Sequence, residues 1–252
     1  MADTAENKNT SSIESMFAAG AHFGYSKSRR HPSFKHIIFG SKNNVDIVNL
    51  EKTSAYLAQV LAFVKKSAQE GKHFIFVATK PEARRIVEER AVSLDIPYVS
   101  NRWIGGTLTN FPQIKKRIAL LHDLQGKREK GELSMYTKKE RLMLDRKIDD
   151  LLKNFGGIMM MERLPDVLFV VDPKKEKMAV VEAIKMKVPV VALLGSDCDL
   201  EGITYPIPAN DSSRASITFF VDQIAKAYTD GKKEPLPAKE TAATAIVEIK
   251  KE

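Results

Sequence analysis

Short runs of apolar residues alternate, along the middle of the chain, with stretches in which apolar residues recur every three or four positions. The apolar runs predict buried strands at residues 73–79, 96–99, 167–172, 188–194 and 205–208. The helical spacing predicts helices at about 82–94, 176–186 and 212–228. Because strands that alternate with helices of this length form right-handed βαβ units, we expect an α/β fold with a parallel sheet flanked by helices.

Two segments fall outside this alternation. Apolar residues 37–39 and 45–48 flank an Asn-rich turn, which predicts an N-terminal β-hairpin, followed by a helix of about 20 residues that ends at Gly71. Residues 110–155 have no strand pattern but carry two narrow apolar seams, and Thr137-Lys-Lys-Glu140 has the form of a capping box. This segment predicts an inserted, antiparallel coiled-coil helical hairpin. Its seams are Phe111, Ile114, Ile118 and Leu121, then Leu144, Ile148, Leu151 and Phe155.

The predicted organisation is a discontinuous α/β domain at 13–109 and 156–230, the helical hairpin at 110–155, and flexible tails at 1–12 and 231–252. Of the 252 residues, 43% are hydrophobic, too many for a disordered chain. One cysteine, Cys198, excludes an internal disulfide and a multi-thiol zinc finger. Without a membrane-spanning run, a signal peptide or a transit peptide, the chain is expected to be a soluble protein of a reducing compartment.

Charge is unevenly distributed along the chain. Residues 15–45 and 96–122 contain no aspartate or glutamate, and together they hold nine lysines and arginines. The formal net charge of the whole chain is +8, so the other residues sum to −1. Two acid-free windows that contain the entire excess indicate a surface that faces a polyanion, with an ordinary soluble basic protein as the alternative.

The candidate RNA contacts lie mainly in these windows. Lys27-Ser-Arg29-Arg30-His31 concentrates charge before the rigid Pro32, which suits a loop between phosphates, although a solvated loop explains the same pattern. Trp103 is read either as a base-stacking residue or as a buried anchor of its loop. The full candidate set is Lys27, Arg29, Arg30, His31, Lys35, Lys42, Lys80, Arg102, Trp103, Thr107, Asn110, Lys115, Lys116 and Arg117.

The main rival is a small-molecule or nucleotide-binding enzyme on the same sheet. The chain has neither a G-x-G-x-x-G nor a G-x-x-x-x-G-K-[ST] phosphate loop, and its five histidines lack zinc-site spacing. Cys198 lies between Asp197 and Asp199, and neighbouring carboxylates disfavour a reactive thiolate. No catalytic set is predicted, and no cofactor is expected. A protein-interaction scaffold that uses the hairpin is a second rival.

Many short motifs in the chain resemble those of one family. They include Gly20-Ala-His-Phe-Gly24, Phe76-Val-Ala-Thr-Lys80, Asn101-Arg-Trp-Ile-Gly-Gly-Thr-Leu-Thr-Asn110, Leu164-Pro-Asp166 and Glu182-Ala183. Over about residues 13–230 the chain closely resembles bacterial small-subunit ribosomal protein two. The resemblance implies a flavodoxin-like sheet with a projecting coiled coil, no enzymatic activity, and binding to 16S ribosomal RNA near the head–body junction of the small subunit.

The resemblance also implies protein partners and a location. Neighbours would include small-subunit ribosomal proteins three, five and eight, with recruitment of ribosomal protein one. A bacterial cytoplasm is the expected location, with a plastid-encoded copy as the alternative. Family members commonly have a histidine at the position of Tyr25, and aspartates at those of Gly195 and Ser212. Because these ligands are missing here, no divalent metal is expected at the loops containing Tyr25, 195–200 and 210–212.

Overall fold

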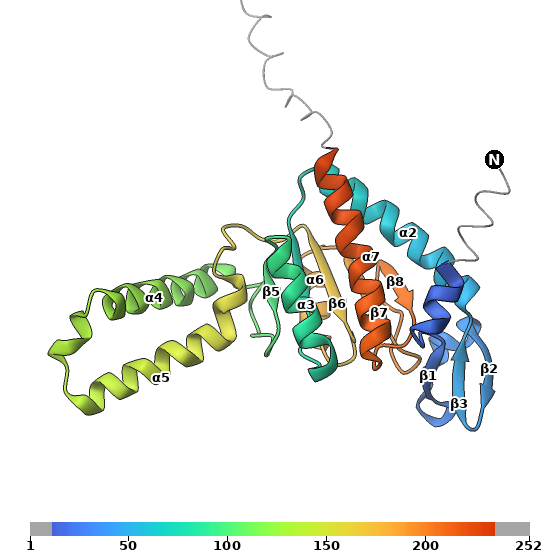
Figure 1. Cartoon of the computed structure of the whole chain (residues 1–252), viewed down its shortest axis with the longest axis horizontal. Coiled ribbons are helices and arrows are strands. Elements are labelled where there is room, and N and C mark those ends of the chain that lie inside the picture. Colours follow the sequence, from blue (N-terminus) through green and yellow to red (C-terminus); the bar gives the residue numbers. More distant parts are fainter. Residues whose placement is uncertain (1–11, 235–252) are drawn as a thin grey trace, which may run out of the picture.

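A five-stranded parallel sheet forms the centre of the computed structural model, which describes residues 12–234 (Figure 1). Its strands are β4 (Phe74–Val77), β5 (Tyr98–Val99), β6 (Val167–Val171), β7 (Val190–Leu194) and β8 (Tyr205–Pro208). Both faces of the sheet are covered, so β4, β6 and β7 are buried at every position and are continuously apolar. The spatial order β5-β4-β6-β7-β8 is 2-1-3-4-5 in chain order, which is flavodoxin-like. The predicted parallel sheet flanked by helices is confirmed.

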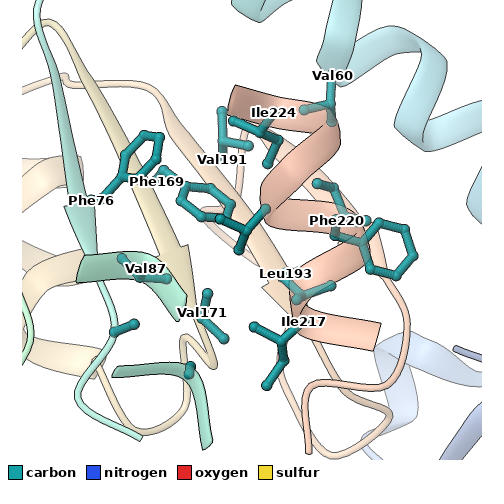
Figure 2. Close-up of a cluster of buried hydrophobic side chains, with 14 of the residues drawn as sticks. Val60, Phe76, Val87, Phe169, Val171, Val191, Leu193, Ile217, Phe220 and Ile224 are labelled. Atoms are coloured by element: carbon teal, nitrogen blue, oxygen red, sulfur yellow. The ribbon is translucent and has the colours of Figure 1, made fainter. Parts of the chain in front are cut away.

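Three helices cover one face of this sheet. They are α2 (Leu50–Gln69), α3 (Pro81–Ser93) and α7 (Arg214–Lys233). Strand residues at alternate positions, such as Phe169 and Val191, pack here with Phe220 and Ile224 of α7 and Val60 of α2 (Figure 2). The interleaved strand residues point to the opposite face, because successive side chains of a strand alternate.

The opposite face is covered by α6 (Lys177–Lys185) and by the loop that follows β5. Ala179 and Ala183 of α6, together with Trp103 and Leu108 of that loop, are buried in this second core layer. Phe34 belongs to the same layer, so both acid-free windows contribute buried side chains to one face of the sheet.

A small antiparallel sheet lies at one end of the molecule, at the right in Figure 1. It consists of β1 (Phe23–Ser26), β3 (Val45–Val48) and β2 (Ile38–Lys42), in the order β1-β3-β2. Asn43 and Asn44 join β2 to β3 with φ of 50° and 62°, as a two-residue turn with left-handed backbone requires. The strand β1 has no counterpart among the predicted elements, and a helix over residues 12–18 precedes it.

Two helices, α4 (Phe111–Glu129) and α5 (Lys138–Phe155), project as an arm from the other end, at the left in Figure 1. The Thr137–Glu140 capping box is present at the start of α5, as predicted. The outer part of the arm has its own apolar core of Leu121, Leu124, Leu133 and Ile148. The base of the arm packs instead in the second core layer of the body, through Phe111, Ile114, Ile118 and Phe155. The hairpin at 110–155 is therefore continuous with the body at its base.

The last helix is longer than the sequence pattern indicates. The sequence pattern predicts a domain end at residue 230, with Gly231 opening a tail, but α7 continues to Lys233. Gly231 is buried because α7 crosses α2 there, and a Cβ at this position would lie 2.4 Å from the Lys65 carbonyl oxygen. The remaining tail residues of the prediction, 1–11 and 235–252, lie outside the described residues. Within residues 12–234, no helix is both long and apolar enough to cross a membrane.

Candidate nucleic-acid interface

The loop between β5 and α4 wraps around the carboxylate of Glu182 on α6. Its Oε1 accepts hydrogen bonds from Nε1 of Trp103 (3.2 Å) and the N–H of Gly106 (2.8 Å). Its Oε2 accepts from the N–H groups of Leu108 (3.0 Å) and Thr109 (3.2 Å). Burial by itself raises the pKa of Glu182, but these donors outweigh it, and the pKa lies below its ordinary value. An ionised Glu182 therefore holds the loop in shape.

This arrangement turns two side chains of the loop, Trp103 and Thr107, toward the interior of the protein. Trp103 is only 7% exposed and Thr107 only 1%, and the Thr107 hydroxyl donates to the carbonyl oxygen of Ile104 (2.6 Å). Their predicted RNA contacts are corrected accordingly: the two side chains anchor the loop. Arg102 and Asn110 are exposed on the same loop and remain available to a partner.

The basic side chains of the first acid-free window, residues 15–45, also divide into exposed ones and one that is paired within the protein. Lys27 and Arg29, in the short helical turn η1 (Lys27–Arg29), are exposed. Arg30 instead pairs with the fully buried Asp46, with its Nε 2.6 Å from Oδ2. This hydrogen-bonded guanidinium holds the pKa of Asp46 below its ordinary value. The guanidinium of Arg30 is thus paired with Asp46, although 20% of the side chain is exposed, and this pairing corrects its predicted role as a free phosphate contact.

His31 is also engaged by its surroundings. Its Nδ1 lies 2.7 Å from the Ser33 hydroxyl and 3.6 Å from Asp199, and it caps η2 (Pro32–Ile37). The remaining predicted side chains are exposed, on the small sheet, on η2 and on the first turns of α4. They are Lys35, Lys42, Lys115, Lys116 and Arg117.

Lys80 lies in a polar cluster where the loops after β4, β6 and β8 meet. Its Nζ is 3.2 Å from Oδ2 of Asp172, 3.4 Å from Oδ2 of Asp211 and 3.0 Å from the hydroxyl of Tyr25. Burial alone lowers the pKa of Lys80, but the charges of Asp211 and Asp172 and the Tyr25 hydroxyl raise it overall. The Lys80 side chain is only 12% exposed, so its predicted RNA contact is corrected to an internal role.

The same cluster contains the one group of potential metal ligands found within residues 12–234. Asp172, Cys198 and Asp211 each offer a ligand atom, and these atoms lie within 4.8 Å of one another. The Lys80 ammonium already supplies positive charge to both carboxylates. Burial and three nearby aspartates raise the pKa of the Cys198 thiol, which opposes both metal binding and nucleophilic chemistry.

Gly195 explains why Tyr25 fits this cluster. A Cβ on Gly195 would lie 2.7 Å from the Tyr25 ring and 2.8 Å from Oδ1 of Asp211. The Tyr25 hydroxyl is 2.8 Å from the hydroxyl of Ser212. Tyr25, Gly195 and Ser212 therefore lie together and fit one another, and an aspartate at 195 would clash with the ring.

The exposed candidates lie on two surfaces. Lys27, Arg29, Lys35 and Lys42 belong to the end with the small sheet, whereas Arg102, Asn110 and Lys115–Arg117 belong to the end with the arm. Sequence reasoning missed a third basic region at 174–187. It counted Glu176 and Glu182 against the lysines there, although both glutamates are buried. Glu176 is the N-cap residue of α6, and Glu182 lies on the buried side of the helix beside Ala179 and Ala183.

Known proteins share this sequence over most of its length. The family model for ribosomal protein S2 matches residues 16–231. The small ribosomal subunit protein uS2 of Sulfurimonas denitrificans is 44% identical, over 87% of this chain and 85% of its own length. The uS2 proteins of Nitratiruptor sp. and Dictyoglomus thermophilum are each 41% identical, over 95% and 87% of this chain and 92% and 89% of their own lengths. The chain therefore belongs to the ribosomal protein S2 family, whose members are structural proteins of the small ribosomal subunit rather than enzymes.

Proposed function

We propose that this protein binds 16S ribosomal RNA through two separate basic surfaces, one at each end of the molecule. The small-sheet surface consists of Lys27, Arg29, Lys35 and Lys42. The arm surface consists of Arg102, Asn110, Lys115, Lys116 and Arg117. A backbone-tracking role suits these side chains, because lysine and arginine bind phosphates without reading base sequence.

One observation carries the proposal. When the internally paired Arg30 and Lys80 are removed from the set, every remaining lysine and arginine is exposed. Residues 15–45 and 96–122 contain no acid that could neutralise them locally. Exposed, unneutralised cations cost little to hold in solution, but they release condensed counterions when they reach RNA phosphates, which favours binding.

The neighbours of the protein form a second part of the proposal. We place it near the head–body junction of the small subunit, beside ribosomal proteins three, five and eight, in the cytoplasmic ribosome. We also assign it a role in docking ribosomal protein one. The support is the family resemblance together with the projecting arm, which we infer to be a coiled coil that reaches beyond the body to position the protein (Figure 1).

Sedimentation tests the function. Tagged full-length chain should travel with the small subunit in a sucrose gradient, and a chain that stays at the top of the gradient would contradict the proposal. Lys27→Ala with Arg29→Ala should weaken incorporation. The control pair, Arg85→Ala with Lys226→Ala, removes the same two residue types from exposed positions of α3 and α7 and should incorporate normally.

A further inference from the structure

The outer face of α6 combines apolar and basic side chains. Met178, Val181 and Ile184 are 59%, 47% and 49% exposed, and exposed apolar side chains are informative when they are grouped on one surface. Their spacing of three places them in one stripe along the helix surface. Lys177 and Lys185 are exposed on the same face and flank the stripe.

Every exposed charge in residues 174–187 is positive. The segment contains five lysines and two glutamates, and both glutamates are used inside the fold. Glu182 holds the loop after β5, and Glu176 accepts hydrogen bonds from the backbone and hydroxyl of Thr79. The face that α6 presents to solvent therefore lacks the acids that its sequence suggests.

Three of the five lysines have no internal partner. Lys174 pairs with Asp197, and Lys175 reaches the carbonyl oxygen of Thr79. No ion pair or side-chain hydrogen bond joins Lys177, Lys185 or Lys187 to another residue within 12–234. Lys187 also has φ of 58°, a left-handed conformation that glycine adopts at lower cost.

We propose that this face of α6 is a docking surface for an acidic, amphipathic helix of another protein in the small subunit. The inference rests on the proposed place of this chain in that subunit. An apolar stripe on the partner would cover Met178, Val181 and Ile184, as in the packing of helix faces. Acids beside that stripe would meet Lys177 at one end and Lys185 and Lys187 at the other.

The apolar stripe favours a protein over RNA as the occupant. Phosphates would satisfy the lysines but would leave three aliphatic side chains facing a polar backbone, whereas a helix satisfies both kinds of group. A neighbouring loop borders the outer face of α6. Ile184 lies against the loop at Gly202, where a Cβ would be 2.5 Å from its Cδ1.

Site-specific photocrosslinking identifies the occupant. We would place p-benzoylphenylalanine at Val181 of the full chain, and in a control at Val92, which is 63% exposed on α3. Irradiation of purified small subunits should give a product at Val181 that survives ribonuclease and is lost on proteolysis. Mass spectrometry should map it to a segment with apolar residues at helical spacing and acids between them.

Other results would overturn the inference. They are a product that ribonuclease removes, a mapped segment without acids, or a yield no greater than at Val92. In each of these cases the chain is still present in the subunit, so the proposed function stands. Absence of the chain from the subunit would refute both proposals.

Lys177→Ala with Lys185→Ala should lower the crosslinking yield at Val181 about fivefold, since each exposed ion pair adds a modest affinity. Lys66→Ala with Lys226→Ala is the matched control, and an equal loss from it would also count against the inference.

Discussion

The conformation of the loop between β5 and α4 depends on Glu182. Replacing it with alanine should leave the N–H groups of Gly106, Leu108 and Thr109 and the indole of Trp103 without their acceptor. We expect a loss of about 2–3 kcal/mol in the free energy of unfolding, the usual cost of unsatisfied buried donors. Trp103 is the sole tryptophan, so its fluorescence reports on this loop directly.

The control for this change is Glu201→Ala, which removes an exposed glutamate. In Glu182→Ala the emission of Trp103 should shift to longer wavelength as water reaches the indole, and chemical denaturation should give the change in stability. Unchanged emission and an unchanged denaturation midpoint would contradict the role assigned to Glu182.

Asp211 makes the stability of the protein depend on pH. Burial raises its pKa from 3.8 to about 6, although Lys80 opposes the shift. Between these values the folded state keeps a proton that the unfolded state releases. The stabilising contribution is therefore complete below pH 3.8 and is lost as the pH rises through about 6. Asp211→Asn keeps the side chain neutral, so it should gain melting temperature relative to the natural protein as the pH is raised across this window.

Thermal unfolding at several pH values measures that gain. Asp149→Asn, at an exposed position of α5, is the control and should follow the natural protein at every pH. A constant difference between Asp211→Asn and the natural protein across the window would show that the carboxyl group is not held protonated by the fold.

Lys80 leads to a prediction about metals. We expect no stoichiometric zinc on the purified protein after dialysis against excess zinc, because the ammonium of Lys80 already lies against Asp172 and Asp211. The Tyr25 phenol is in addition a poor ligand. Elemental analysis provides the measurement. One zinc per chain that disappears in Asp211→Asn or Asp199→Asn would disprove the prediction.

At the scale of elements, the arm divides into a base that belongs to the body and an outer part that does not. Phe111, Ile114, Ile118 and Phe155 pack in the body core, whereas Leu121 and Ile148 pack only within the arm. Replacing residues 119–151 with a short Gly/Ser linker should therefore leave a cooperatively unfolding body that binds the small subunit poorly. Thermal unfolding followed by circular dichroism measures the cooperativity of the body, and sedimentation measures its binding to the small subunit.

A longer deletion, which also removes the base of the arm, provides a second test. Removing all of 111–155 should also lower the melting temperature, because it takes four buried side chains out of the body core. Loss of cooperative unfolding in the shorter deletion, or equal melting temperatures for both, would show that this division of the arm is wrong.

At the scale of the whole molecule, the two basic surfaces lie toward opposite ends of an elongated protein (Figure 1). Under the proposed function, binding of one surface holds the other near RNA at high effective concentration, so each should strengthen the other. Neutralising Lys27 and Arg29, or Lys115 and Lys116, should each reduce the salt dependence of RNA binding by about 1.5 units of slope.

Filter binding to 16S RNA across a salt series measures these slopes. Combining the two pairs of substitutions should weaken binding by more than either pair alone, with Arg85→Ala and Lys226→Ala as the control. A salt slope that stays at the value of the natural protein in the two pair variants and in their combination would exclude phosphate contacts at these residues.

Some features of this protein follow from the sequence by itself. The buried strands β4, β6 and β7 are uninterrupted apolar runs of four or five residues, which is the pattern typical of a parallel sheet covered on both faces. The capping box at Thr137 and the turn at Asn43–Asn44 are equally local, because each depends on residues within a few positions of one another. Periodicity and local backbone preference are sufficient for such elements.

Only the tertiary structure decided which charges remain for a partner. Arg30 lies in an acid-free window and Lys80 follows β4, and each pairs with a carboxylate that the fold brings to it. Glu182 contacts a loop more than seventy residues away in the chain, and that contact turns Trp103 inward. Local sequence does not contain these pairings, because a charge is neutralised by whatever lies near it in space, and long-range packing determines that neighbour.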